Sequence, residues 1–268
     1  MRAVAPSVKS ARVTRILITN DDGIRAPGLA ALARMAARWG DPLIVAPDRD
    51  KSGIGHAITL KEPLRAHRLS AGALPCEAWE VVNGSPTDCV YLGLHHVLAG
   101  ERPALVLSGI NPGPNLGWDA FYSGTVAGAR EGALQGVPGV AFSLLSGPEL
   151  PFDELGPIVD HVIEYALATP LPPWVCLNVN VPNPRIGPIR GIRGTCLGQR
   201  HYSKEIHVRQ DPRGGEYLWI GGKDVFMPDL PGSDCNAVRE GFVAVTPLGC
   251  DLTHPAALAN LATIESTL

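Results

Sequence analysis

Two adjacent aspartates, Asp21 and Asp22, are the residues of this sequence best suited to chemistry. They follow the apolar run 16–19 and Asn20, and Gly23 behind them lets the backbone turn. Neighbouring carboxylates repel each other, and a cation that joins them removes the repulsion. A divalent metal ion is the simplest such cation, because carboxylate oxygens are among the ligands it prefers.

Two further polar loops follow buried runs that are typical of strands. The run Pro42–Ala46 leads into a loop with Ser52, and Ala104–Leu107 leads into a loop with Asn111. Together with the aspartates these loops offer only hard oxygen donors, which favour Mg²⁺, Mn²⁺ or Ca²⁺ over zinc. Because the protein would supply only a few ligands to the ion, coordination positions would stay open for water and substrate.

A third group of residues suits an anion. Ser123 and Thr125 precede a predicted helix, Val126–Gln135, whose first backbone amides are free to bind a phosphate. Helix capping alone would account for one of the two hydroxyls. Asn115 and the amides around Gly53 stand in neighbouring loops. A metal ion beside an anion site favours phosphoester hydrolysis, because the metal lowers the pKa of a bound water and neutralises phosphoryl charge.

The elements that position these residues alternate between strands and helices. Such alternation predicts an α/β fold, a Rossmann-like, doubly wound, mostly parallel sheet in three layers. Loops at the carboxyl ends of parallel strands meet at one edge, where ligands bind. The predicted helices are Pro27–Arg38 and Leu155–Ala168, and further strands are predicted at Ile58–Leu64, Trp79–Val82, Gly139–Ser143 and Val175–Val181.

Beyond Pro182 this alternation breaks. Strands predicted at Glu205–Val208, Tyr217–Ile220 and Phe242–Thr246 have no helices between them, which indicates an antiparallel arm. An isolated hairpin cannot bury both faces, so we expect it to pack on a partner subunit. The chain would then comprise a basic, disordered tail (1–14), a catalytic core (15–182), and an arm with a terminal helix at Ala256–Leu268 (183–268).

Composition narrows the class of protein. The 268 residues carry a net charge of -3 and hold no apolar run long enough to span a bilayer, so we expect neither duplex nucleic acid nor a membrane as partner. Six scattered cysteines without a CxxC pair predict reduced thiols in a cytoplasmic protein. The basic tail lacks the apolar stretch of a secretory signal, although a weak organellar transit sequence is an alternative.

Other motifs have structural explanations. Ser85, Pro86 and Asp88 match a helix N-cap, a first helical residue and an acidic capping box, so a substrate role is not required. His95 and His96 are adjacent in the same predicted helix and would not share a face, which argues against metal binding. The sequence contains neither a P-loop Gly-Lys-Ser/Thr nor a Gly-x-Ser-x-Gly nucleophile elbow in its site loops.

Several segments in order resemble the SurE (survival protein E) family, from about Arg15 to about His254. They are Thr19–Gly28, Ala46–Gly53, Gly84–Cys89, Ser108–Gly117, Tyr122–Thr125, Leu177–Pro182, Gln210–Gly214, Asp234 and Val245–Leu248. The resemblance implies a metal-dependent phosphatase of nucleoside 5′- and 3′-monophosphates, with short polyphosphate as a further substrate. It also implies a Rossmann-like core, and an arm exchanged within a homodimer or a homotetramer.

The family's site residues can be carried over by position. The resemblance places the ligands of one Mg²⁺ or Mn²⁺ ion per subunit, or Ca²⁺ in crystals, on Asp21, Asp22, Ser52 and Asn111. Catalytic roles are expected for Asp21 and Asp22. Phosphate or substrate contacts are expected at Asn20, Gly53, Asn115, Ser123, Gly124 and Thr125. Ser85 replaces a threonine common in the family and keeps its hydroxyl, while 53–57 departs from members with Ser-Asn there, which would alter base or sugar contacts.

Two alternatives remain open at this point. A haloacid-dehalogenase-type phosphatase needs two aspartates separated by one residue, and Gly23 occupies that position relative to Asp21, which argues against this mechanism. A nucleotide-sensing or interaction module without catalysis is also compatible with a Rossmann-like scaffold.

Overall fold

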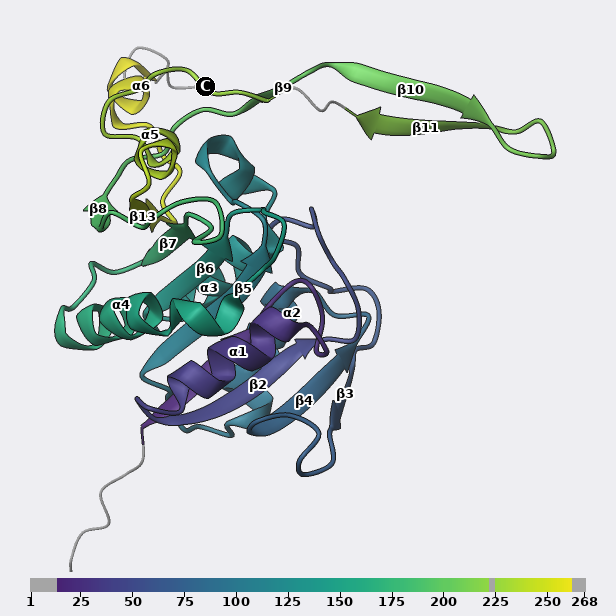
Figure 1. Ribbon diagram of the computed structural model, residues 1–268. Coiled ribbons are helices and arrows are strands. Elements are labelled where there is room, and N and C mark those ends of the chain that lie inside the picture. The colour runs from purple at the N-terminus through teal and green to yellow at the C-terminus, as the bar shows by residue number, and fades with distance from the viewer. Residues whose placement is uncertain (1–13, 222–224, 262–268) are drawn as a thin grey trace, which may run out of the picture.

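A nine-stranded sheet forms the centre of the computed structural model, which describes residues 14–221 and 225–261 (Figure 1). The strand order is β3-β4-β2-β1-β5-β6-β7-β13-β8. The bounds are β1 Arg15–Thr19, β2 Asp41–Pro47, β3 Arg65–Arg68, β4 Glu77–Val82, β5 Leu105–Pro112, β6 Gly139–Leu144, β7 Val175–Val181, β8 Ile192–Gly194 and β13 Val243–Gly249.

The six strands from β4 to β7 in this order pair in parallel, whereas β3 and β13 join them antiparallel. The chain leaves β1 towards β2 and β4, then returns to β5 on the other side of β1. The order therefore reverses between β1 and β5, and such a switch point opens a crevice at the carboxyl ends of the strands. Asp21 follows β1, and Asn111 ends β5, so both belong to this switch point.

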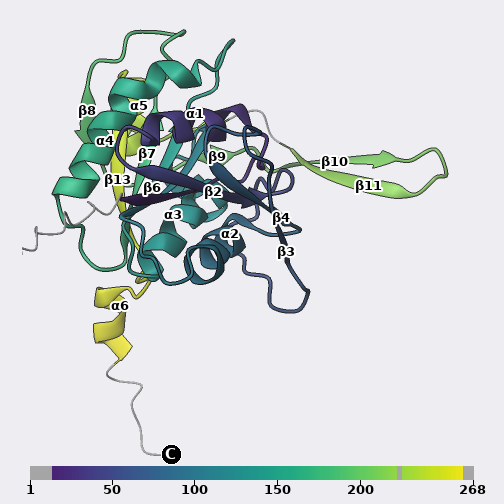
Figure 2. The ribbon, with the colours of Figure 1, turned by 90° about the horizontal axis from the view of Figure 1, so that it is seen from below.

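Helices cover both faces of the sheet, which confirms the predicted three layers (Figure 2). One face carries α1 (Pro27–Ala36) and α4 (Gly156–Ala168), and the other carries α2 (Pro86–Leu92) and α3 (Gly124–Leu134). Successive side chains of a strand point to opposite faces of the sheet, so each face has its own hydrophobic core. In β1, Ile16 and Ile18 pack in the cluster that includes α1 and α4, while Leu17 packs in the cluster that includes α2.

Small residues bring α3 close to the sheet. A Cβ on Gly128 would lie 2.7 Å from Thr19 Cγ2, and one on Gly132 would lie 2.8 Å from Val106 Cβ. This close approach brings the N-terminus of α3 up to the end of β1.

A hairpin of β10 (Glu205–Gln210) and β11 (Glu216–Gly221) projects away from the body (Figures 1 and 2). Its residues are exposed apart from Gly221, which is half-buried. At its root, β9 (His201–Tyr202) pairs antiparallel with β12 (Val225–Phe226). The predicted hairpin is thus confirmed, and its use in oligomerisation stays a prediction.

Three features differ from expectation. The strand predicted at Ile58–Leu64 is wrong: this segment is a loop, and the strand is β3, which follows it. Phe242–Thr246 does not belong to the arm, because β13 pairs with β7 and extends the central sheet beyond the predicted core boundary at Pro182. A short helix, α5 (Asp234–Arg239), was not predicted.

The chain ends have a limited description. The terminal helix is present as α6 (Pro255–Asn260), while residues 262–268 lie outside the described residues. So does the predicted tail, apart from Thr14. In the described part of the chain, no helix is long and apolar enough to cross a membrane.

Candidate metal and phosphate site

The turn after β1 presents the two aspartates. Asn20 is fully buried, and its Nδ2 donates to Gly23 O at 3.0 Å, while Gly23 adopts φ +98°. Lys51 N donates to the backbone oxygen of Asp21 at 2.7 Å, which joins the turn to the loop after β2. Asn20 therefore holds the turn and is not among the residues that line the cavity beside it, so its expected contact with substrate stays a prediction.

The four predicted ligands come together around a cavity of about 500 Å³ at the carboxyl edge of the sheet. Asp21, Asp22, Ser52 and Asn111 all line it, as do the predicted phosphate-binding residues Gly53, Asn115 and Ser123. Three loops far apart in the sequence thus converge because their parallel strands end at one edge.

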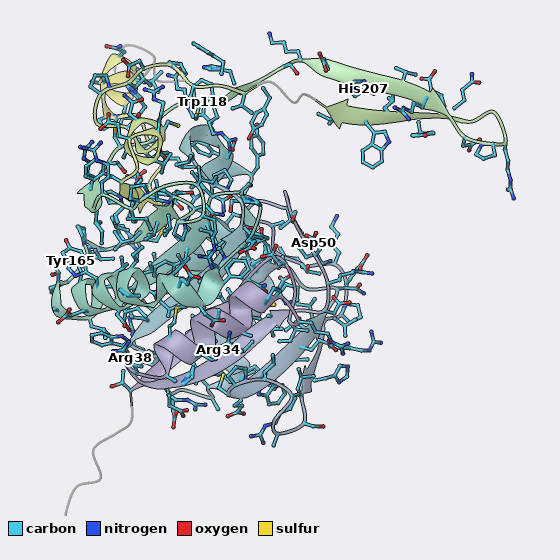
Figure 3. The ribbon with its side chains drawn as sticks, viewed as in Figure 1. Arg34, Arg38, Asp50, Trp118, Tyr165 and His207 are labelled. Atoms are coloured by element: carbon cyan, nitrogen blue, oxygen red, sulfur yellow. The ribbon has the colours of Figure 1, made fainter. Side chains whose placement is uncertain are left out.

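Local hydrogen bonds orient the neutral ligands. Asn111 Nδ2 donates to Gly113 O at 2.8 Å, so the amide oxygen is the atom left to bind a cation. Ser52 donates to Asp50 Oδ1 from both N and Oγ, each at 2.6 Å, and its hydroxyl oxygen keeps lone pairs for a ligand. Asp50, which also lines the cavity, is labelled at this end of the sheet in Figure 3.

The carboxylates lack a positively charged neighbour. No Lys, Arg or His is among the described residues that line the cavity. Burial, reinforced by Asp21 and Asp50, raises the pKa of Asp22 to about 7, and burial also raises the pKa of Asp21. Asp22 Oδ2 is buried and has no hydrogen-bond partner among the described residues.

This donor set fits a divalent cation. Two carboxylates, one amide oxygen and one hydroxyl are hard ligands, and a cation would meet the unpartnered Asp22 Oδ2. The described residues contain no cluster of three or more His, Cys, Asp or Glu side chains suited to a metal ion. A metal at this site would therefore rely on neutral oxygens and solvent to complete its coordination.

The start of α3 differs from the predicted phosphate cradle. Ser123 caps the helix, because its Oγ accepts from Val126 N at 3.1 Å, and its hydroxyl proton remains available to an anion. Thr125 is fully buried, and its hydroxyl donates to Asp21 Oδ1. The second hydroxyl thus holds the carboxylate, and the contact of Thr125 with phosphate stays a prediction.

Gly124 acts through its lack of a side chain. A Cβ there would lie 2.7 Å from Asp21 Cβ and 3.0 Å from Asp21 Oδ2. Because such contacts are too short, only glycine lets α3 begin this close to the aspartate.

Asn115 is held by four hydrogen bonds. Its Nδ2 donates to Ser143 Oγ at 2.7 Å, and its backbone N donates to Asn180 Oδ1 at 2.8 Å. Its backbone oxygen accepts from Asn178 at 2.8 Å and from Asn180 at 3.1 Å. The segment Leu177–Pro182, singled out in the sequence without a role, therefore fixes a residue of the cavity wall.

Sequence reasoning missed four acidic or aromatic residues that line the cavity: Asp50, Asp119, Tyr122 and Tyr202. Asp50 lies two positions before Ser52, so it belongs to a loop that the sequence had already indicated as part of the site. Tyr202 enters from the root of the arm, 83 positions from its partner Asp119, and no local pattern indicates that approach.

The fold and site define a doubly wound α/β protein with a buried acidic site at its topological switch point. The model of the Survival protein SurE family matches residues 16–204, and the chain belongs to that family.

Relatives match over nearly the whole chain. A protein named 5′-nucleotidase SurE from Anaeromyxobacter sp. (strain Fw109-5) is 50% identical over 250 residues, 92% of this chain and 94% of the relative. A protein of the same name from Myxococcus xanthus is 45% identical over 248 residues, 92% of each chain. The crystal structure of the SurE protein from Aquifex aeolicus has a TM-score of 0.80 and 37% identity, covering 94% of this chain and 100% of that one.

Proposed function

We propose that this chain is a divalent-metal-dependent phosphatase that hydrolyses nucleoside 5′-monophosphates to nucleoside and phosphate. The observation that carries the proposal is the carboxylate pair beside a cavity whose described lining has no cationic side chain, where Asp22 Oδ2 has no partner among the described residues. The name 5′-nucleotidase SurE of relatives up to 50% identical supports the substrate class. The family resemblance extends it to 3′-monophosphates and short polyphosphate.

Asp21, Asp22, Ser52 and Asn111 would hold one Mg²⁺ or Mn²⁺ ion. When bound, the ion would lower the pKa of a coordinated water and neutralise charge on the phosphoryl group. Asp21 would orient or deprotonate the attacking water through the carboxylate oxygen that Thr125 leaves free.

Three residues are suited to the phosphate oxygens. The Ser123 hydroxyl can donate, because its oxygen rather than its proton serves the helix cap. The backbone N–H of Gly53 and the fixed side chain of Asn115 complete this set. Such preorganised donors stabilise charge that develops in the transition state.

Phosphate release from 5′- and 3′-nucleoside monophosphates and short polyphosphate, measured with Mg²⁺, Mn²⁺ or chelator, tests the proposal. We expect release from 5′-monophosphates that depends on the metal and disappears with chelator. A folded protein that binds nucleotides but releases no phosphate with any metal would be a binding module instead.

We also propose a cytoplasmic homodimer or homotetramer built through the arm. The register pairs Ile206 with Ile220, and these side chains are 61% and 94% exposed on one face of the hairpin. We expect Ile206→Ser combined with Ile220→Ser to lower the molar mass measured by light scattering. Arg209→Ser, on the other face of β10, is the control and should leave the mass unchanged.

A further inference from the structure

The cavity has a second wall whose chemistry differs from that of the aspartate pair. This wall contains Asp119, Tyr122 and Tyr202, none of which the metal and phosphate roles use. Asp119 lies in the short 3₁₀ helix Gly117–Phe121, and Tyr202 lies in β9 at the root of the arm. The cavity volume of about 500 Å³ lies within the range of about 300–1,000 Å³ typical of sites that enclose a small molecule.

Asp119 is satisfied by the protein itself. Arg200 forms an ion pair with Asp119 Oδ2, and both side chains are largely buried. The Tyr202 hydroxyl donates to the same oxygen at 2.6 Å. Burial, and then this hydrogen bond, raise the pKa of Tyr202 to about 12, so the hydroxyl stays a donor. Asp119 is therefore no further metal ligand, because its charge already has a cationic partner.

The same arrangement leaves one oxygen of Asp119 available. Both contacts use Oδ2, and no described residue donates to Oδ1. A carboxylate oxygen fixed in orientation beside a cavity suits a hydroxyl group, since charge-assisted hydrogen bonds are short and strong.

Tyr122 presents an aromatic ring to the same space. The residue is 69% exposed, yet its backbone is fixed: Tyr122 N donates to Asp119 O at 3.0 Å, and the backbone oxygen of Tyr122 accepts from Gly55 N at 2.8 Å. An exposed ring on a fixed backbone offers a flat surface to a flat ligand. Nucleobases stack on such rings with little preference for the identity of the base.

We infer that this wall binds the nucleoside: the Tyr122 ring contacts the base, and Asp119 Oδ1 accepts a hydrogen bond from a ribose hydroxyl. Tyr202 and Arg200 are positioning residues that hold Asp119. The inference rests on the proposed function, because the phosphate must lie at the aspartate pair for the nucleoside to reach this wall. The root of the arm thereby contributes to substrate recognition.

Three substrates of decreasing size separate the roles. AMP carries base and sugar, ribose 5-phosphate only the sugar, and glycerol 2-phosphate neither. For Tyr122→Ala we expect KM for AMP to rise about tenfold, with ribose 5-phosphate and glycerol 2-phosphate unchanged. For Tyr202→Phe we expect KM to rise about threefold for both AMP and ribose 5-phosphate, with glycerol 2-phosphate unchanged.

Tyr165→Ala is the matched control. Tyr165 is an exposed tyrosine on α4, far from Trp118 and the site loops (Figure 3). We expect its kinetics to equal those of the parent protein with all three substrates. An equal loss on all three substrates in Tyr122→Ala or Tyr202→Phe would reduce that residue to a structural role, and unchanged KM values would overturn the inference.

Binding of adenosine, which has no phosphate, separates this inference from the proposed function. Calorimetry with Mg²⁺ should show about tenfold weaker adenosine binding to Tyr122→Ala than to the parent protein or to Tyr165→Ala. If the parent protein hydrolyses none of the three phosphates, the proposed function fails. Adenosine binding alone then tests whether this wall binds a nucleoside. Equal adenosine affinity in all three proteins would contradict it.

Discussion

The two walls of the cavity use the same chemical group in opposite ways. On one wall, Asp21 and Asp22 lie together without a cationic side chain, and burial raises the pKa of both. On the other wall, Asp119 has Arg200 and Tyr202 as partners. The difference teaches that the role of a carboxylate here depends on the charge around it. A carboxylate supplied with a protein cation is fixed in place, whereas one without it is left to bind a cation from solution.

A third kind of carboxylate belongs to the framework. Asp234 is fully buried and accepts three backbone N–H groups: Gly117 N at 2.8 Å, and Gly198 N and Cys235 N at 2.7 Å. It joins the loop that carries Asp119 to the segment that leads into the arm. These backbone N–H groups fix the carboxylate of Asp234, as Arg200 fixes the carboxylate of Asp119.

The largest effect should come from Asp22→Asn. Loss of this ligand should lower phosphate release by on the order of 10³-fold, because a catalytic metal supplies several kcal/mol of charge stabilisation. Without metal, the variant should melt at a higher temperature than the parent protein at pH 8, since one repelling, buried charge is gone. Assays of phosphate release and thermal melts with and without Mg²⁺ measure both changes.

Asp153→Asn is the control for that comparison, because Asp153 is an exposed acid paired with Arg34 away from the cavity. It should keep the activity and the stabilisation by Mg²⁺. An active Asp22→Asn protein would end the assignment of this wall to a metal.

Asp234→Ala should have the next largest effect, which is a loss of stability. It leaves three buried N–H groups without an acceptor, which we expect to lower the free energy of unfolding by about 3 kcal/mol. Urea denaturation measures the change. Asp251→Ala is the control, because Asp251 is exposed and accepts from Thr253 N in the C-terminal segment. A fully stable Asp234→Ala protein would show that these loops are held by other contacts.

Gly124→Ala should have the smallest effect of the three. The added Cβ would lie 2.7 Å from Asp21 Cβ, so Asp21 or α3 must shift. We expect activity to fall by about tenfold, or about 1.4 kcal/mol, with the fold retained by circular dichroism. Gly156→Ala is a close match, because Gly156 is also the first residue of a helix and a Cβ there meets nothing within 4 Å. Equal activity in both variants would mean that the position of Asp21 tolerates the shift.

Much of the wall that carries Asp21 and Asp22 was predictable, because the sequence patterns that indicate it are local. The buried run before Asp21, the turn at Gly23 and the polar loops after two further strands all appear as short patterns. Parallel pairing then brings strand ends to one edge, so Ser52 and Asn111 join the aspartates without further information. The alternation of strands and helices likewise predicted the sheet and its three layers.

The nucleoside wall was not predictable, because its contacts join distant segments. A contact of the aspartate wall was missed for the same reason, because the Thr125 hydroxyl donates to Asp21, 104 positions earlier. Tyr202 and Arg200 reach Asp119 from a segment that Asp234 joins to the loop of Asp119 through hydrogen bonds from Gly117 N and Gly198 N. The position of β13 in the sheet was missed for the same reason, since its pattern fits an arm strand equally well.

The sequence by itself determined which polar loops follow the buried strands of the site and which side chains are hard oxygen ligands. These properties follow from local periodicity, turn chemistry and side-chain type. Only the tertiary structure decided which carboxylate receives Arg200 and which receives no cation. That choice depends on the electrostatic neighbours that folding brings within a few ångströms, and residues 81 positions apart in the chain, such as Asp119 and Arg200, carry no local sign of becoming neighbours.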